Sequence, residues 1–127
     1  MTTWTSGELE KVGTAEELRL ASVRGDGTVR NPVTMWIVRH DDDLYVRSVN
    51  GRTGGWFRGA QDRHEARIRA GGVEKDVLLV ETDEMNDEID AAYRTKYRRY
   101  AASIVGSIVS AKAREATLKL APRSTNS

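Results

Sequence analysis

The segment from Glu65 to Ala70 restricts the fold of this chain more than any other part of the sequence. Its letters, EARIRA, alternate between apolar and charged residues, and this period of two is typical of a strand with one buried face and one face in water. Gly71-Gly72 follows directly, and glycine supplies the positive φ of a tight turn. Lys75 to Thr82 then has the composition of a partner strand, with Val77 to Val80 expected to be buried on both faces. The sequence therefore predicts a β-hairpin.

Further segments are rich in the β-branched and aromatic residues that favour strands. We expect strands at Leu18 to Arg24, Thr28 to Arg39, Leu44 to Asn50 and Ala113 to Leu120. Gly25-Asp26-Gly27 marks a turn after the first of these segments, and a turn at His40-Asp41-Asp42-Asp43 joins the next two in a long hairpin. Pro32 lacks a backbone N–H, so it interrupts pairing on one side of its strand.

Helical signals occur in three places. Residues 1–17 are expected to contain a short helix, and Thr14 with Glu17 fits either a capping box or a short turn. Trp56 to Asp62 has room for about two helical turns. The clearest helix is predicted from Glu84 to Ala101, with Thr82 or Asp83 as its cap. Its expected packing face consists of Met85, Ile89, Ala92, Tyr93, Lys96, Tyr97 and Tyr100.

The segment from Ala102 to Ser110 gives no clear signal, because Gly106 disfavours one uninterrupted helix. Residues 123–127 are expected to form a frayed tail. About six mostly antiparallel strands joined by tight turns predict a sheet that closes or nearly closes to remove its edges. The expected fold is thus mainly β (α+β), a split β-barrel with a short helix after the third strand and a longer helix before the last one. At 127 residues, we expect one domain spanning 1–127.

Composition excludes several classes of function. Lys and Arg number 20 against 19 Asp and Glu, which argues against a general nucleic-acid-binding protein. The chain has no cysteine, so disulfides and thiolate metal sites are excluded. His64 has no second histidine at ligand spacing, and His40 beside Asp41 to Asp43 is best explained as part of an exposed hairpin turn. No secretory pattern follows Met1 and no apolar stretch approaches the ~20 residues of a membrane span. We therefore expect a soluble, cytoplasmic protein without a metal.

The stretch from Val46 to Arg58 carries the strongest signal for a site. A strand runs into a glycine-rich turn and then into the start of a helix, where backbone N–H groups attract anions. Suitable cationic and hydroxyl donors for phosphate oxygens are Arg47, Ser48, Arg52, Thr53 and Arg58. The residues alone fit two interpretations, a solvated loop that needs glycine for its turn or a phosphate or carboxylate site.

Four motifs together resemble a known family. They are Gly51 to Arg58 (GRTGGWFR), Arg30 to Val33 (RNPV), Arg67 to Gly72 (RIRAGG) and Ile89 to Tyr97 (IDAAYRTKY). The chain resembles the split-barrel flavin- and deazaflavin-binding proteins of the deazaflavin-dependent nitroreductase type, which have a pyridoxamine-phosphate-oxidase-like barrel, and in particular an uncharacterised bacterial branch. The resemblance spans roughly Leu18 to Pro122. It implies FMN or a deazaflavin as cofactor and an oxidoreductase that acts on a small organic substrate.

The resemblance also implies roles for individual residues. Arg52, Thr53 and Gly54 would hold the cofactor phosphate, with Arg30 nearby. Trp56 and Phe57 would lie by the entrance, where Phe57 replaces the usual tyrosine of the nitroreductases. The backbone of the next strand would lie along the ring system, through Val33, Thr34 and Met35.

Two other hypotheses remain open from the sequence. The barrel can instead hold a small apolar ligand without a cofactor, either for binding or for a cyclisation or isomerisation, because no acid–base pair is evident. Alternatively it is a non-catalytic dimeric module, with Trp4, Trp36 and Trp56 supplying interface area. A homodimer is expected for the enzyme as well.

Overall fold

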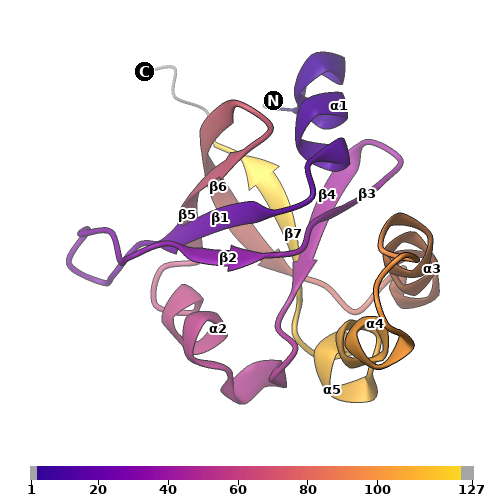
Figure 1. The fold of residues 1–127 in the computed structure, drawn as a ribbon. Helices are drawn as coiled ribbons and strands as arrows, with labels where there is room; N and C mark the ends of the chain where they lie inside the picture. Colours follow the sequence, from indigo (N-terminus) through magenta and orange to yellow (C-terminus); the bar gives the residue numbers. More distant parts are fainter. Residues whose placement is uncertain (1–2, 124–127) are drawn as a thin grey trace.

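A seven-stranded antiparallel sheet forms the centre of the computed structural model, which describes residues 3–123 (Figure 1). The strands occur in the order β2-β1-β5-β6-β7-β4-β3 across the sheet. Their bounds are β1 (Leu18–Ser22), β2 (Val33–Met35), β3 (Val38–His40), β4 (Asp43–Arg47), β5 (Glu65–Ala70), β6 (Val73–Glu81) and β7 (Thr117–Pro122). The predicted frayed tail lies outside the described residues, apart from Arg123.

The two outermost strands explain the curvature of this sheet. β2 and β3 form its opposite edges, yet only Trp36 and Ile37 separate them along the chain. Met35 at the end of β2 and Val38 at the start of β3 are three residues apart and so can be separated by no more than ~11 Å. The sheet must therefore curl until its edges come close together. The predicted split β-barrel is thereby confirmed, with seven strands instead of about six.

The hairpin predicted from the EARIRA alternation is present. β5 and β6 pair through Ala70 and Val73, and the turn residues Gly71 and Gly72 have φ of 57° and 83°. The expectation that Val77 to Val80 are buried on both faces was wrong, because Leu78 and Val80 are 43% and 41% exposed. In a curled sheet only the inner face is the core, and no second layer covers these two side chains.

The segment Thr28 to Arg39 does not form one strand. Its residues divide into β2, which pairs with β1, and β3, which pairs with β4, because the chain changes sheet edge at Trp36. The final strand is also displaced from its predicted position: β7 is Thr117–Pro122, while Ala113 lies in a helix. The other two strands are shorter than predicted, although Val23 and Val29 still form an isolated bridge.

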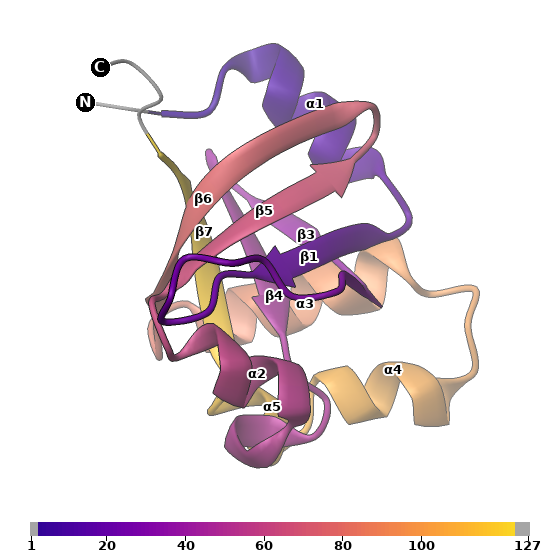
Figure 2. The same ribbon diagram turned by 90° about the vertical axis from the view of Figure 1, so that its left-hand side faces the viewer.

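Short helices cover the ends and one side of the barrel. They are α1 (Ser6–Thr14), a 3-10 turn η1 (Gly51–Thr53), α2 (Gly55–Ala60), α3 (Asn86–Lys96), α4 (Ala102–Ile108) and α5 (Ala111–Arg114). In both views α1 lies at one end of the barrel, while α2 and α5 lie at the other (Figure 2). α2 confirms the predicted short helix.

The helix caps differ from those predicted. Thr5 and Glu8 form the capping box of α1, so the Thr14–Glu17 capping box was wrong. The helix predicted from Glu84 to Ala101 is shorter in the structure, because α3 ends at Lys96 with Tyr97 as its C-cap and α4 begins only at Ala102. Met85 is the N-cap of α3, 46% exposed and with a φ of 61°. Met85 therefore does not belong to the packing face.

Apolar side chains form two clusters. One fills the barrel, and the other lies between the β3–β4 hairpin and helices α3 and α4. The second cluster includes Val38, Tyr45, Ile89, Tyr93, Tyr97, Val105 and Ile108. It fixes the helices against the strands that border the candidate site.

Candidate functional site

A pocket of about 320 Å³ lies where β2, the residues after β4, and α4 meet. Its size falls within the range of small-molecule sites. The lining residues are Val33, Thr34, Met35, Trp36, Arg47, Val49, Asn50, Trp56, Ile104, Ser107 and Ile108. Most of these are apolar or aromatic, so the pocket suits a flat or apolar ligand with a few polar groups.

β2 contributes directional hydrogen-bonding groups to this pocket. It is an edge strand that pairs only with β1. Backbone N–H and C=O groups on the free side of an edge strand have no ladder partner, so the backbone around Thr34 is available to a ligand.

Trp36 is a firmly held wall of the pocket. Its ring stacks on that of Tyr97 with centroids 3.9 Å apart and planes 3° apart. The Tyr97 hydroxyl accepts the Ile37 N–H at 3.2 Å and donates to the Glu16 carbonyl at 2.7 Å. Burial raises the pKa of Tyr97 to about 12, so the hydroxyl stays protonated and keeps both bonds.

Arg47 forms the polar floor of the pocket, and its guanidinium is fully occupied. Guanidinium has five N–H groups. Their acceptors are Thr117 Oγ1 at 2.9 Å, a carboxylate oxygen of Asp90, the Ile108 carbonyl at 3.2 Å, and the carbonyl and Oδ1 of Asn86 at 3.2 and 3.0 Å. Because each donor has a partner, Arg47 has none left for a cofactor phosphate.

Two other predicted cations form ion pairs outside the pocket. Arg52 donates to Glu81 at 2.7 Å and to the Glu115 carbonyl at 3.2 Å, and its hydrogen bond lowers the pKa of Glu81. Arg30 donates to Asp62 at 2.5 Å and to the Gly59 carbonyl at 3.1 Å. A phosphate must compete with these carboxylates to engage either side chain.

The remaining predicted residues from Ser48 to Arg58 do not line the pocket. Ser48 is buried, and its Oγ has no hydrogen-bond partner among residues 3–123. A Cβ at Gly54 would lie 2.5 Å from that oxygen, so only glycine fits there. Thr53 Oγ1 donates to the Asn50 carbonyl at 3.3 Å and Arg58 is exposed. Phe57 lies wholly inside the barrel core and not at an entrance.

The structure thus brings five of the twelve predicted site residues to one pocket: Val33, Thr34, Met35, Arg47 and Trp56. Sequence reasoning missed the contribution of α4, because Ala102 to Ser110 gave no clear signal. It also missed the partners of Arg47. Asn86 and Asp90 are four residues apart and so share a helix face. Polar residues on this face beside the apolar Ile89 were the feature of the sequence that could have indicated partners for a buried cation.

No group of three or more potential metal-ligating side chains occurs between residues 3 and 123. Within the same residues, no helix is long and apolar enough to cross a membrane.

Comparisons with known proteins place the fold among split barrels. An F420 reductase matches with a TM-score of 0.64 and 13% identity over 95% of this chain and 97% of that chain. A conserved hypothetical protein from Mycobacterium tuberculosis matches with 0.67 and 12% over 97% and 83%, and a FAD-binding protein from Mesorhizobium loti with 0.58 and 17% over 96% and 92%. No curated protein matches significantly.

These likenesses establish the fold alone, and they confirm the resemblance seen in the sequence. A family model matches residues 8–120, which is most of the chain. The chain therefore belongs to the family described as uncharacterized protein conserved in bacteria (DUF2255).

Proposed function

We propose that this protein binds the ring of a flavin or deazaflavin in the pocket between β2, Asn50 and α4, and uses it to reduce a small organic substrate. The observation that carries the proposal is the pocket itself, an apolar cavity with Trp36 and Trp56 as aromatic walls beside a free strand edge. The fold neighbours named as an F420 reductase and a FAD-binding protein support the same class of cofactor.

The chemistry of this pocket fits the ring part of such a cofactor. Flat heteroaromatic rings stack on indole, and their carbonyl and N–H edges match an open strand edge. Asn50 and Ser107 add side-chain polar groups to the lining. A bound flavin or deazaflavin would supply hydride transfer, while the protein orients the ring and excludes water from it.

The phosphate part would lie outside the pocket, along the loop that leads to α2. Thr53 at the end of η1 and Arg58 on α2 are both exposed. Arg52 would join them at the phosphate after its ion pair with Glu81 breaks. This rearrangement makes Glu81 a competitor for Arg52. Replacing Glu81 by Gln should therefore tighten cofactor binding, whereas Arg52→Gln should weaken it.

Tryptophan fluorescence tests the proposal directly. The purified protein is titrated with FMN, FAD and coenzyme F420, and the emission of both protein and cofactor is followed. Trp36 and Trp56 line the pocket, while Trp4 is buried elsewhere with its Nε1 donating to the Leu120 carbonyl at 2.9 Å. Quenching should thus survive Trp4→Phe and decrease in Trp36→Phe and Trp56→Phe.

The same titration can contradict the proposal in two ways. Absence of binding up to about 100 μM, which corresponds to roughly −5.5 kcal/mol, contradicts the cofactor proposal. Binding that quenches all three tryptophan variants equally contradicts its location.

A second candidate function is carried by the charges around the pocket. Arg47 has every donor occupied, and both Arg30 and Arg52 are paired with carboxylates. A neutral apolar ligand, bound without any cofactor, fits these facts without breaking an ion pair. Native mass spectrometry of the purified protein that detects a retained apolar compound and no flavin would favour this function.

A further inference from the structure

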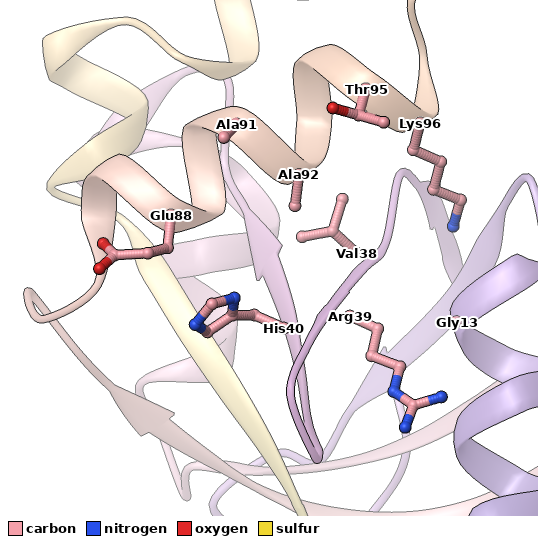
Figure 3. A pocket seen from close by; sticks show the side chains of 9 residues that line it. All are labelled: Gly13, Val38, Arg39, His40, Glu88, Ala91, Ala92, Thr95 and Lys96. Atoms are coloured by element: carbon pink, nitrogen blue, oxygen red, sulfur yellow. The ribbon is translucent and has the colours of Figure 1, made fainter.

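A second groove, separate from the candidate pocket, lies between α3 and β3 (Figure 3). Its volume is about 490 Å³. Apolar side chains form its middle, from Val38 on β3 and from Ala91 and Ala92 on α3. Lys96 and Arg39 lie at one end and Glu88 with His40 at the other.

Lys96 is the unusual group in this groove. The side chain is half-buried, and its ammonium donates to the Ile37 carbonyl at 2.5 Å. Within residues 3–123 no carboxylate lies at salt-bridge distance from it. Burying a charge without an opposite charge is unfavourable, and burial accordingly lowers the pKa of Lys96 to about 8.

The neighbouring charges do not compensate Lys96. Arg39 donates to the Asp41 carbonyl at 2.7 Å and lies 3.7 Å from Asp42, both on the β3–β4 turn. Glu16, near the end of α1, forms an ion pair with Arg99. The groove therefore offers a cation, an apolar middle and no competing anion at the cationic end.

We propose that this groove binds a small organic carboxylate, with the carboxylate on Lys96 and the apolar body along Val38, Ala91 and Ala92. The ammonium has two N–H groups besides the one that bonds to Ile37. An anion there supplies the missing opposite charge and forms a charge-assisted hydrogen bond. This inference does not depend on the cofactor proposal, because the two cavities share no lining residue.

Carboxylate binding is linked to protonation of Lys96, so the affinity should depend on pH. A bound carboxylate favours the charged ammonium, so binding should raise the pKa of Lys96 from about 8 toward its ordinary 10.5. Affinity should in turn fall as pH rises above 8. The titratable groups at this end of the groove are Tyr97, whose ring centre lies 5.2 Å from the ammonium, Arg39 on β3 and the Glu16–Arg99 pair. His40 and Glu88 lie at the opposite end, so His40→Gln should leave this dependence in place.

The test uses hexanoate as probe and hexanamide as its uncharged control. NMR of the full chain should show hexanoate shifting the amide signals of Val38, Ala91, Ala92 and Lys96, with little effect from hexanamide. The pKa of the Lys96 ammonium, followed through its Cε carbon, should rise on binding. An unchanged pKa at saturating hexanoate, or no binding up to about 20 mM, overturns the proposal.

Variants distinguish binding of hexanoate in the groove from nonspecific attraction to a positive charge. Lys96→Gln should weaken hexanoate binding about tenfold or more, while Lys11→Gln, an exposed lysine on α1, should not. Ala91→Leu fills the groove at an exposed position and leaves Lys96 intact, so it should also abolish binding. Binding that survives both Lys96→Gln and Ala91→Leu overturns the proposal.

Discussion

Arg47 shows how one buried side chain joins several elements. It starts on β4 and reaches α3, the end of α4 and β7 through its five donors. Its side chain has no exposed surface, and that of Asp90 is 10% exposed. Removing one partner of such a pair leaves an uncompensated buried charge, so stability should depend strongly on Asp90.

We expect Asp90→Asn to lower the free energy of unfolding by about 3 kcal/mol. Asp87→Asn is the matched control, because Asp87 lies on the same helix and pairs with Arg114 while 90% exposed. Exposed pairs contribute at most about 1 kcal/mol. Urea denaturation measures both values, and similar losses in the two variants would contradict the role assigned to Arg47.

Tyr93 and Tyr97 are four residues apart on one helix face but differ in hydrogen bonding. Tyr97 binds the linker between β2 and β3, whereas the buried Tyr93 hydroxyl has no partner among residues 3–123. Tyr97→Phe should destabilise the protein by about 1–3 kcal/mol, because it leaves the Ile37 N–H unsatisfied. Tyr93→Phe should be neutral or stabilising in the same denaturation experiment. The reverse order would show that these hydroxyls do not decide the stability.

At the scale of elements, one carboxylate links α1 to the barrel in addition to the buried apolar side chains of Leu9 and Val12. Glu8 accepts the N–H of Thr5 at 3.0 Å and the ammonium of Lys75 on β6 at 2.6 Å. The hydrogen bond from Lys75 is the largest cause that lowers the pKa of Glu8 below 4.5. This carboxylate therefore both caps α1 and connects it to the sheet.

The lowered pKa of Glu8 sets the direction of a pH effect. A group whose pKa is lower in the folded state stabilises that state above its unfolded pKa, here 4.5, and the stabilisation is lost as pH falls through the folded value. Glu8→Gln should thus cost about 1 kcal/mol at pH 6 and progressively less as pH falls below 4.5. Glu10→Gln, at an exposed position of the same helix, should show no such trend in free energy of unfolding.

The elements that sequence predicted well are those fixed by local patterns. The alternation in Glu65 to Ala70 and the glycines after it gave β5 and its turn at the correct residues, because both depend on neighbouring positions alone. The division of Thr28 to Arg39 between two sheet edges was not predictable in this way. It depends on which strands lie beside this segment in three dimensions.

The candidate site likewise contains residues that local motifs predicted and contacts that depend on distant parts of the chain. Val33, Thr34, Met35 and Trp56 were placed at a site through motifs and a family resemblance, and the structure brings them to one pocket. The saturation of Arg47 came from Asn86, Asp90 and Thr117, which are 39 to 70 residues away in the chain. A basic residue in a glycine-rich stretch indicates a phosphate site equally well whether or not distant carboxylates already occupy it.

At the scale of the whole molecule, the mouth of the candidate pocket is apolar and exposed. Val33 on β2, Val49 after β4 and Ile104 on α4 line it and are 37%, 43% and 50% exposed. The adjacent strand β2 has a free edge but only three residues, so extended strand pairing with another chain is limited. A second copy of the chain would therefore cover the pocket through side-chain contacts across this rim.

We therefore predict that the protein forms a homodimer through the rim of Val33, Val49 and Ile104. Ile104→Glu should shift the protein to monomer in sedimentation velocity, because two like charges would face each other in a desolvated contact. Leu78→Glu is the matched control, since Leu78 is 43% exposed on the outer face of β6, and it should leave the dimer intact. A wild-type monomer at every concentration, or dissociation by Leu78→Glu alone, would contradict this interface and leave the pocket open to solvent in solution.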